Sequence, residues 1–341
     1  IQKDKLTGIY NREFFFEKAG EFIKNQAPGS CILCCFDIDH FKLVNDQYGS
    51  SEGDRVLRHI GAELKQIYDD ALGVCGRISG DNFACVFVNT PQAMARLNAC
   101  LQTSLLPKDA PGNLTFSMGR CVPDDSALPV SAVYDRAYIA KQSVKGRYDK
   151  HVADFDDSLM EALVREQEIV REMDEALRKR QFEVWFQPQI NHATGALIGA
   201  EALVRWRHPV KGLISPGAFI PIFEQNGFIY EMDKFVWAES CRHLRRWIDE
   251  GQDPLPVSVN ISRYDIYKPD LLEVFTGIIR EYNIPPDLLH VEITESAFTR
   301  SEKQIIEVVN RFIALGFIVE IDDFGSGYSS LNTLKDVPAQ V

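Results

Sequence analysis

Oxygen-bearing side chains follow several strand-like runs in the second half of the sequence. The runs are 197–200, 257–259, 289–291 and 318–321, and the side chains that follow them are Glu201, Asn260, Glu292, Asp322 and Asp323. In a β/α barrel the carboxyl ends of the strands share one face, so such side chains would meet there. Carboxylate and amide oxygens are ligands for hard Mg²⁺ or Mn²⁺. Taken singly, each residue fits a helix cap or a loop acid better, so the metal prediction depends on the whole set.

The two adjacent aspartates suggest what such a metal site would do. Asp322 and Asp323 can each face one of two metal ions, an arrangement that clamps both oxygens of an in-line phosphoryl displacement. The second half of the sequence is therefore predicted to act on a phosphate ester.

A second set of acids lies in the first half. Asp37 and Asp39 stand at the end of the apolar run 31–38, and Asp81 lies in the polar turn 79–82 between two strand-like runs. Carboxylates that converge from a strand end and a turn can hold Mg²⁺ against a triphosphate. Solvated turn acids are the alternative that spacing alone leaves open.

The elements expected around both sets alternate between helix and strand. In the first half, helical patterns cover 11–24, 54–68 and 130–143, and strand patterns cover 31–38, 73–78, 83–88 and 114–121. This order predicts an α/β sandwich with an internal hairpin. In the second half, strand-like runs at 184–186, 197–204, 256–261, 289–293 and 317–321 alternate with helical runs at 218–226, 235–249, 271–282 and 302–315. That rhythm predicts a β/α barrel with too few units here to close eight strands.

Residues 156–180 form one long helical pattern between the halves. Its apolar positions are Leu159, Leu163, Val170, Met173 and Leu177, its first turn is acidic and its last turn is basic. Few Gly or Pro interrupt it, so we predict a stiff helical connection. It either transmits conformational change or is a plain connector packed on one domain.

Composition and charge limit the class of protein. The 341 residues are 45% hydrophobic and 25% charged, which is typical of globular proteins, and the length favours two domains. We find no membrane-spanning stretch, no signal-peptide pattern and no initiator Met. Residues 1–150 carry 18 basic and 18 acidic side chains, whereas 151–341 carry 19 and 31. The second half is thus not expected to bind a nucleic-acid polymer. Its excess of acidic side chains is interpreted as a surface that keeps the protein in solution.

Eight cysteines are present, but their spacing favours neither disulfides nor zinc. Cys31 and Cys34 would point to opposite faces of a strand, and no second Cys-x-x-Cys exists. We predict buried free thiols in a reducing cytoplasm.

Several motifs follow one another in the first half. They are DKLTGIYNR at 4–12, FDIDHFK at 36–42, Asn45-Asp46 and Gly53-Asp54. In this order they resemble GGDEF-type diguanylate cyclase domains over about residues 1–150, which implies a cyclase-like α/β sandwich. The resemblance implies that Asp37 and Asp81 bind Mg²⁺ and that Asn45 and Asp54 recognise guanine.

The signature of that family is altered here. Where the family has Gly-Gly-(Asp/Glu)-Glu-Phe, this sequence has Ser79-Gly80-Asp81-Asn82-Phe83. An amide at Asn82 cannot accept a proton as a carboxylate does, and it brings no charge to a metal. The family's Arg-x-x-Asp inhibition motif is also absent. We expect a degenerate domain that binds GTP with Mg²⁺ and regulates its neighbour, or a structural or dimerising relic; a residual cyclase is the less favoured rival.

The second half carries a longer series of motifs. They are WFQP at 185–188, EALVRW at 201–206, SPGAFIP at 215–221, VNIS at 259–262, EITES at 292–296 and DDFGSGYSS at 322–330. They resemble the EAL family of cyclic-di-GMP phosphodiesterases over about residues 181–341, which implies a TIM-like β/α barrel. The resemblance implies one metal on Glu201, Asn260, Glu292 and Asp322, and a second on Asp323. It further implies that Arg205 contacts a phosphate, that Gln187 contacts a guanine and that Glu295 supports the 322–330 loop.

The resemblance completes the functional expectation. A metal-bridged water would hydrolyse cyclic-di-GMP to linear pGpG. The expected domains are a GGDEF domain at 1–152, a connecting helix at 153–180 and a partial EAL domain at 181–341. The family's lysine, further glutamate and glutamine would follow Val341, so the chain alone is expected to be inactive. A cytoplasmic homodimer is expected, and a non-catalytic cyclic-di-GMP receptor is the rival.

Overall fold

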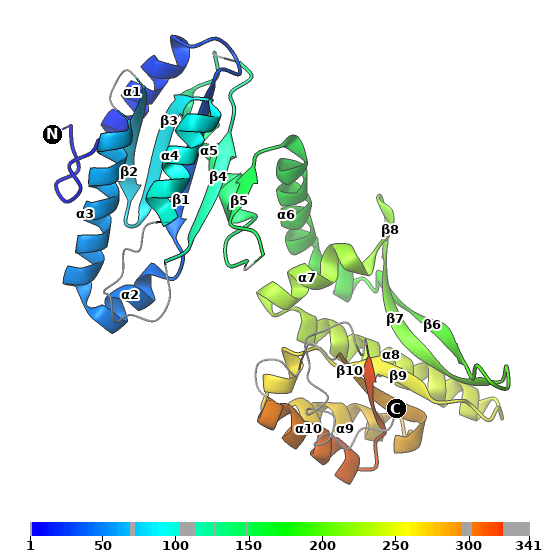
Figure 1. The fold of residues 1–341 in the computed structure, drawn as a ribbon. Helices are drawn as coiled ribbons and strands as arrows, with labels where there is room; N and C mark the ends of the chain where they lie inside the picture. The colour runs from blue at the N-terminus through cyan, green and yellow to red at the C-terminus, as the bar shows by residue number, and fades with distance from the viewer. Residues whose placement is uncertain are drawn as a thin grey trace. The chain divides into compact units, whose positions relative to one another are not determined.

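The computed structural model describes residues 2–68, 72–102, 114–125, 127–147, 149–294, 297 and 302–322. The chain divides into two compact units, residues 1–164 (unit 1) and 165–341 (unit 2). The division falls inside one helix, α6 (Asp157–Arg178). Each unit combines helices with a sheet (Figure 1), which confirms the predicted α/β class.

Unit 1 is an α/β sandwich whose strands have the order β2-β3-β1-β4-β5. Strand β1 pairs antiparallel with β3 and β4, and β4 pairs parallel with β5. The strands are β1 (Cys31–Ile38), β2 (Gly73–Ser79), β3 (Asn82–Val88), β4 (Phe116–Cys121) and β5 (Val152–Asp154). The helices are α1 (Arg12–Lys24), α2 (Phe41–Tyr48), α3 (Ser50–Ile67), α4 (Pro91–Gln102) and α5 (Val130–Gln142).

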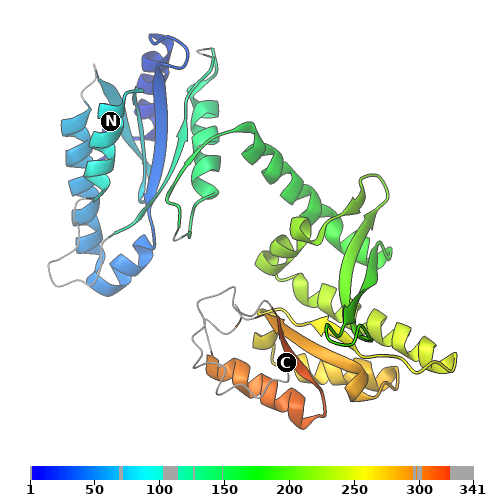
Figure 2. The ribbon, with the colours of Figure 1, turned by 45° about the vertical axis from the view of Figure 1, so that its right-hand side comes forward.

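Every residue of β1 is buried, because helices cover both faces of the sheet (Figures 1 and 2). Cys34 packs in the cluster formed with α3 and α4, whereas Cys31 and Cys35 pack in the cluster formed with α1 and α5. This alternation follows from the two-residue period of a strand. All eight cysteines are buried and free, which confirms the prediction of buried free thiols.

Three elements of unit 1 were not predicted. Helix α2 follows His40, whose φ is +55° and whose side chain does not cap the helix, so the usual start signal is missing. Helix α4 does have a cap, since Thr90 Oγ1 accepts a hydrogen bond from the backbone of Ala93 at 3.2 Å, and that signal was overlooked. Strand β5 has three residues and exists because it pairs with β4, which no local pattern reveals.

Unit 2 holds a sheet with the order β11-β10-β9-β7-β6, with β8 paired to β7. Strands β7, β9, β10 and β11 run parallel, and β6 runs antiparallel to β7. The strands are β6 (Phe182–Ile190), β7 (Leu197–His208), β8 (Gly212–Ile214), β9 (Val257–Asn260), β10 (Leu289–Thr294) and β11 (Val319–Asp322). The helices are α7 (Pro216–Asn226), α8 (Ile229–Asp249), α9 (Leu271–Glu281) and α10 (Glu302–Ala314), with 3₁₀ turns at Asp265–Tyr267 and Pro286–Leu288.

One hydrophobic core joins the sheet of unit 2 to its helices. It holds alternate residues of the central strands, such as Val259 and Val291, together with Trp237 of α8, Phe275 of α9 and Phe312 of α10. Parallel strands that alternate with helices are the predicted β/α pattern. The residues between the apolar ones therefore lie on the opposite face of the sheet.

Helix α6 is amphipathic, but its buried stripe differs from the predicted one. Ile169 and Ala176 are buried, and Met173 and Leu177 pack beside them on the core of unit 2. Val170 is 40% exposed, so its assignment to the stripe was wrong. The spacing 169, 173, 176 and 177 fits the helical period and leaves position 170 at its edge. In the described part of the chain, no helix is long and apolar enough to cross a membrane.

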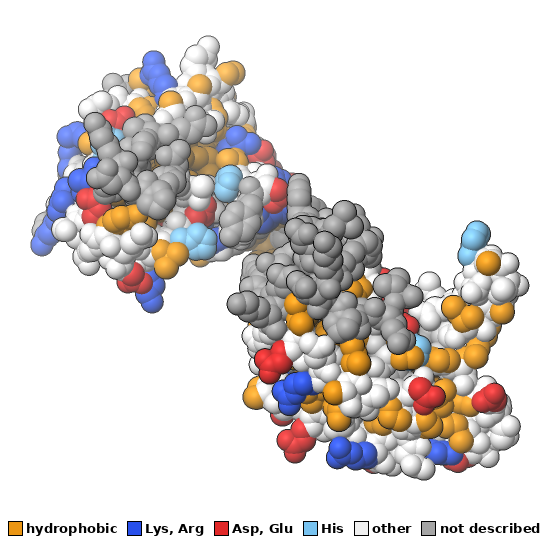
Figure 3. Space-filling model, turned by 60° about the horizontal axis from the view of Figure 1, so that its bottom comes forward, with side chains coloured by type: hydrophobic (Ala, Val, Ile, Leu, Met, Phe, Trp, Pro, Cys, Tyr) orange, Lys and Arg blue, Asp and Glu red, His pale blue; other side chains and the backbone are white. Residues whose placement is uncertain are grey.

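Charged side chains of both signs are scattered among one another on the face of each unit that Figure 3 shows. Many are paired across one helical turn, as Arg55 is with Glu52 and Arg242 with Glu239. Exposed pairs of this kind contribute about 0–1 kcal/mol each. The fold therefore depends on its cores rather than on its surface charge.

Gly119 in β4 allows α5 to lie directly on the sheet. A Cβ atom at this position would lie 1.9 Å from the carbonyl oxygen of Ala137 and 2.3 Å from the amide nitrogen of Lys141. Both neighbours are helix backbone and cannot turn away. We predict that Gly119→Ala destabilises unit 1 by about 3 kcal/mol, the upper end for overpacking, in denaturant unfolding of the complete gene product.

Gly20→Ala in α1 is the matched control. Its added Cβ would meet only Val130, at an ordinary 3.6 Å, and alanine favours helix by up to about 1 kcal/mol. Equal effects of the two changes would show that the close approach of α5 to β4 does not limit the stability of unit 1.

Candidate functional site

Strands β7, β9, β10 and β11 carry polar side chains on the face opposite the core of unit 2. These residues alternate with buried apolar ones, and they are Glu201, Ser258, Asn260, His290, Glu292, Glu320 and Asp322. Since successive side chains of a strand point to opposite faces, all of them share one face, called here the polar face. Four of the five predicted metal ligands lie on it. The fifth, Asp323, and the supporting Glu295 lie outside the described residues.

Two of the predicted ligands touch. The amide Nδ2 of Asn260 donates to Oε1 of Glu201 at 3.0 Å. The indole of Trp237 in α8 donates to the backbone oxygen of Asn260 at 3.1 Å, which fixes the end of β9. Glu292 pairs with Asn260 in the β9–β10 register, and it is only 6% exposed. Asp322 ends the next strand, opposite Thr294.

The donor set of the polar face fits a hard divalent cation. Glu201, Glu292 and Asp322 offer carboxylate oxygens and Asn260 an amide oxygen, the ligands that Mg²⁺ and Mn²⁺ prefer. Burying a carboxylate is costly unless a cation compensates it, and Glu292 is buried. Among the described side chains, no three of the His, Cys, Asp or Glu type gather around one point as a ready metal site.

The predicted substrate residues lie on the neighbouring hairpin of β6 and β7. Gln187 is exposed and pairs in register with Glu201. Arg205 stands four residues after Glu201 on the same face of β7, about 13 Å along the strand. Its guanidinium lies 5.7 Å from the ring centroid of Trp185 and donates to the carbonyl of Val204 at 2.9 Å. An oriented cation and an exposed carboxamide thus flank the acidic end of the polar face.

A second layer of the polar face was missed by the sequence analysis. Oε2 of Glu320 accepts a hydrogen bond from the hydroxyl of Ser258 at 2.6 Å, and its Oε1 lies 2.7 Å from Nδ1 of His290. Burial by itself would raise the pKa of Glu320, but these two contacts outweigh it and lower the pKa. The signal was the strict alternation V-S-V-N, L-H-V-E and V-E-I-D, which marks a polar residue two positions before Asn260, Glu292 and Asp322.

A buried acid pair lies below the loop that follows β9. Asp233 of α8 and Asp265 are 9% and 0% exposed, and Asp265 accepts a hydrogen bond from the backbone of Ser262 at 2.9 Å. Burial raises the pKa of Asp233 far above its usual value, and the neighbouring charge of Asp265 raises it further. Asp233 therefore keeps a proton to a higher pH than an exposed aspartate does, and it shares that proton with Asp265.

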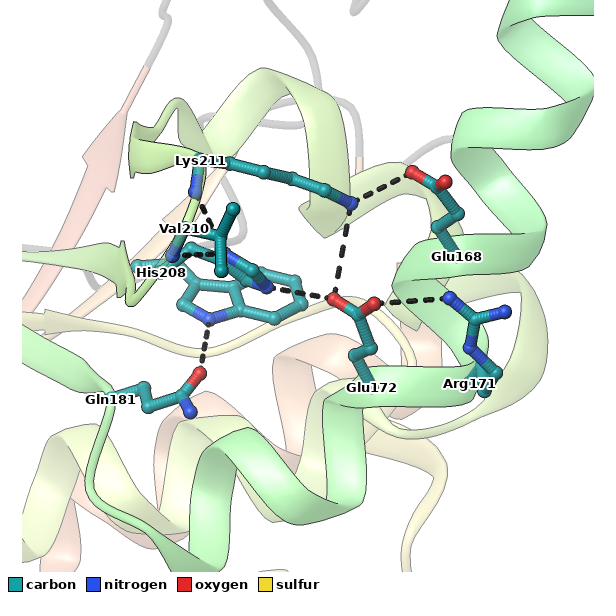
Figure 4. Close-up of polar contacts among 8 residues, drawn as sticks. Glu168, Arg171, Glu172, Gln181, His208, Val210 and Lys211 are labelled. Carbon is teal, nitrogen blue, oxygen red and sulfur yellow. Dashed lines mark hydrogen bonds and ion pairs between the residues drawn. The ribbon is translucent and has the colours of Figure 1, made fainter.

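Helix α6 is anchored to the end of β7 and to the turn before β8 through His208 and Lys211 (Figure 4). Nδ1 of His208 accepts the backbone N–H groups of Val210 and Lys211 at 3.1 and 3.0 Å, so its proton sits on Nε2. That Nε2 donates to Oε2 of Glu172 in α6 at 2.8 Å. Lys211 adds an ion pair to Glu168 at 2.7 Å. The strand that carries Glu201 and Arg205 is thus tied to the connecting helix.

Two lysines contact the predicted metal ligand Asp37 of unit 1. Oδ2 of Asp37 lies 2.9 Å from Nζ of Lys141 and 2.6 Å from Nζ of Lys145. The side chains of Asp37 and Lys141 are 2% and 1% exposed, and Lys141 also donates to the amide oxygen of Asn82. Burial raises the pKa of Asp81, and the charge of Asp37 raises it further, whereas Lys145 opposes the shift.

These residues do not fit a divalent metal at Asp37. Two ammonium groups already compensate its buried carboxylate, and the position of the lost acid, Asn82, is an amide that accepts from one of them. A divalent ion on this carboxylate would lie against the ammonium of Lys141, and like charges at such a distance repel strongly where water is excluded. A buried ion pair of this kind is instead structural: removal of one partner lowers the free energy of unfolding by about 3–5 kcal/mol.

The predicted guanine residues lie together at the junction of α2 and α3. Asn45 of α2 packs so closely on Gly53 of α3 that a Cβ there would lie 2.0 Å from its side-chain oxygen. Asp54 follows directly, is 47% exposed, and lies 3.5 Å from Arg58. The structure thus brings a carboxamide and an accessible carboxylate to one end of two packed helices.

The shared proton of Asp233 gives a prediction for the pH dependence of stability. Its pKa is raised on folding, so between the unfolded value near 4 and the raised folded value unfolding releases a proton, and the free energy of unfolding falls there by up to about 1.4 kcal/mol per pH unit. Asp233→Asn keeps a donor for Asp265 at every pH. We expect the variant to gain stability over the unmodified protein as pH rises from 4.5 to 7.5, measured by urea unfolding.

Asp249→Asn is the control on the same helix, because Asp249 is exposed and pairs only with Arg245 among the described residues. It should follow the unmodified protein at each pH. An Asp233→Asn variant whose stability ran parallel to that control would show that Asp233 is ionised in the folded state.

Comparisons with known proteins place both units in families. Residues 1–150 match the family "Diguanylate cyclase, GGDEF domain", and residues 170–341 match the family "EAL domain". "Cyclic di-GMP phosphodiesterase NbdA" of Pseudomonas aeruginosa is 31% identical over 98% of this chain and 44% of its own length. "Bifunctional diguanylate cyclase/cyclic di-GMP phosphodiesterase MucR" of the same organism is 29% identical over 98% of this chain and 50% of its own length.

The chain spans about half the length of these curated relatives. Among solved structures, "Vibrio cholerae LapD S helix-GGDEF-EAL (bound to c-di-GMP)" matches with a TM-score of 0.54 at 15% identity, over 98% of this chain and 80% of that one. This likeness concerns the fold alone. The predicted order of domains is confirmed: the chain belongs to the EAL domain family and carries a GGDEF domain ahead of its EAL domain.

Proposed function

We propose that the complete gene product hydrolyses cyclic-di-GMP to linear pGpG at the polar face of unit 2. The observation that carries this proposal is the row of oxygen donors on four neighbouring parallel strands, with Asn260 in contact with Glu201. Membership of the EAL family and relatives named as cyclic di-GMP phosphodiesterases support the choice of substrate.

The acids and the amide of the polar face would hold the metal ions that hydrolysis requires. Glu201, Asn260, Glu292 and Asp322 would hold one Mg²⁺ or Mn²⁺, and Asp323 would hold a second. Bound there, such ions supply a water of lowered pKa and neutralise the charge that develops on the phosphate. Without them the carboxylates of the polar face would repel a phosphodiester.

Residues of β6 and β7 would bind and orient the substrate. The guanidinium of Arg205 suits a phosphate because it presents a fork of N–H donors, and the ring of Trp185 beneath it limits its directions. The carboxamide of Gln187 offers both a donor and an acceptor to a guanine edge. Glu295 would support the loop that begins at Asp322.

A non-catalytic cyclic-di-GMP receptor is the second candidate. The LapD structure that shares this fold is described as bound to c-di-GMP, and binding of that ligand is all that a receptor requires. A receptor would bind the same ligand at the same face without turnover, so product analysis separates the two functions.

For unit 1 we propose a regulatory role without cyclase activity, either by binding GTP or as a structural partner of unit 2. The amide at Asn82 supports the loss of catalysis, because it cannot take the proton of a 3′-hydroxyl. Lys145 supports nucleotide binding, since its side chain is 45% exposed and its ammonium lies beside Asp37, where a phosphate could be contacted. A cytoplasmic location is supported by the eight free cysteines, and a homodimer is proposed from the family resemblance.

Glu201→Gln tests the assignment of the metal ligands. The amide keeps the size of the side chain and an oxygen for Asn260 but removes the charge that would hold a metal. We expect cyclic-di-GMP hydrolysis with Mg²⁺ or Mn²⁺, followed as pGpG by liquid chromatography, to fall more than about 100-fold. Chelation of the metal should abolish hydrolysis by the unmodified protein.

The control is Glu231→Gln, an exposed glutamate on α8 that pairs with Lys234. It should leave turnover unchanged. Retained activity in Glu201→Gln would contradict the metal assignment, and tight cyclic-di-GMP binding without any pGpG from the unmodified protein would favour the receptor.

Calorimetry with GTP tests the proposed role of unit 1. We expect binding with or without Mg²⁺, because lysines already compensate Asp37, and no cyclic-di-GMP formed from GTP. Lys145→Met should weaken GTP binding about 10-fold or more, the value of one charge-assisted hydrogen bond. Lys18→Met, which removes an exposed ammonium paired with Glu21 in α1, is the control. If GTP produces no heat of binding, the GTP-binding role is wrong and unit 1 has only the structural role.

A further inference from the structure

Three side chains below the predicted metal ligands form one hydrogen-bonded unit, called here the lower layer. Glu320 of β11 accepts from Ser258 of β9 at 2.6 Å and contacts His290 of β10 at 2.7 Å. Each of the three stands two residues before a predicted ligand on the same strand: Ser258 before Asn260, His290 before Glu292 and Glu320 before Asp322. One carboxylate thus connects the three strands that carry those ligands.

The arrangement is not that of a nucleophilic serine. In such a site the serine hydroxyl donates to the histidine, and the acid contacts only the histidine. Here the hydroxyl of Ser258 donates directly to Glu320, so its proton is held by the acid and not by His290. Glu320 is the common acceptor, and the lower layer has a structural geometry.

The lower layer selects one register among several that hydrophobic burial allows. A one-residue slip of β11 against β10 would turn Val319 away from the core, so burial excludes it. A two-residue slip keeps every apolar residue on the core side and every polar residue on the polar face, so burial does not exclude it. Such a slip would move Asp322 about 7 Å along the sheet. It would also carry the carboxylate of Glu320 out of reach of both its partners.

The hydrogen bonds that Glu320 makes with Ser258 and His290 are strong because the residues are largely shielded from water. Ser258 is 1% exposed, and the side chains of His290 and Glu320 are 13% and 28% exposed. Hydrogen bonds to an ionised carboxylate in such surroundings are short and about twice as strong as neutral ones. Loss of the carboxylate would leave the hydroxyl of Ser258 buried without this acceptor.

We propose that Glu320 is a positioning residue that fixes the register of β9, β10 and β11 and thereby the places of Asn260, Glu292 and Asp322. The consequence for metal binding follows from the geometry of the strands. The consequence for hydrolysis rests on the function proposed above. Changes to residues that orient metal ligands weaken metal binding or activity by about 10- to 100-fold.

The test compares Glu320→Leu with Glu320→Gln in the complete gene product. We measure Mn²⁺ affinity by calorimetry, kcat and KM for cyclic-di-GMP, and the thermal midpoint. Glu320→Leu should lower Mn²⁺ affinity and kcat by about 10- to 100-fold, with KM within about 2-fold, because Gln187 and Arg205 belong to other strands. Glu320→Gln keeps one acceptor oxygen and should recover part of the loss. Glu307→Leu, an exposed position on α10, is the matched control.

A second pair of variants decides the case in which Glu320→Leu does not fold. His290→Asn keeps an N–H donor near the place of Nδ1, whereas His290→Leu removes it. We expect the asparagine variant to bind Mn²⁺ at least about 5-fold more tightly than the leucine variant. Equal affinities in this pair, or a folded Glu320→Leu with unchanged Mn²⁺ affinity, would overturn the positioning role.

The outcomes also separate this inference from the proposed function. If the unmodified protein hydrolyses cyclic-di-GMP and the Glu320 and His290 variants keep its Mn²⁺ affinity and kcat, only the inference fails. Mn²⁺ binding that the variants weaken, without hydrolysis by the unmodified protein, would defeat only the function. An unmodified protein that binds no Mn²⁺ would defeat both.

Discussion

The alternation of apolar and polar residues in the parallel strands is the constraint on which unit 2 depends. Val257, Val259, Leu289, Val291 and Val319 must be buried against α8, α9 and α10, because that core holds the sheet to its helices. Because successive side chains of a strand point to opposite faces, the residues between them must lie on the other face of the sheet. The polar face is a by-product of building the core, and it gathers carboxylates that would otherwise avoid one another. The chemistry proposed for this face and the stability of the fold therefore have one origin.

The two units compensate buried carboxylates in different ways. In unit 1 the carboxylate of Asp37 is compensated internally by Lys141 and Lys145, and the amide of Asn82 completes the arrangement. Among the described residues of unit 2, the carboxylates on the polar face outnumber the cationic side chains there, an imbalance that suits an external divalent cation. A fixed ammonium gives structure, because it cannot be exchanged. A metal gives chemistry, because it polarises whatever else it binds.

The connecting helix bears on both the fold and the site. Its second half packs on the core of unit 2 through Ile169 and Ala176, and Glu172 accepts the Nε2 proton of His208 at the end of β7. The same strand carries Glu201 and Arg205. A displacement of α6 would therefore act on the strand that holds a predicted metal ligand and a predicted phosphate contact. These contacts are those of a helix packed on unit 2, as a connector would be, and transmission through α6 stays a prediction.

Local patterns and motifs in the sequence were enough to determine the order of the two domains, most helices and strands, the free cysteines and the residues at the strand ends. Periodicity and short motifs are local properties, so they can be recognised without coordinates. The partners of those residues were decided only by the tertiary structure. Lys141 lies 104 residues from Asp37, and Ser258 lies 62 residues from Glu320. Strand β5 exists only through its pairing with β4. Contacts between distant segments depend on how the sheets pair and pack, and no local pattern records that.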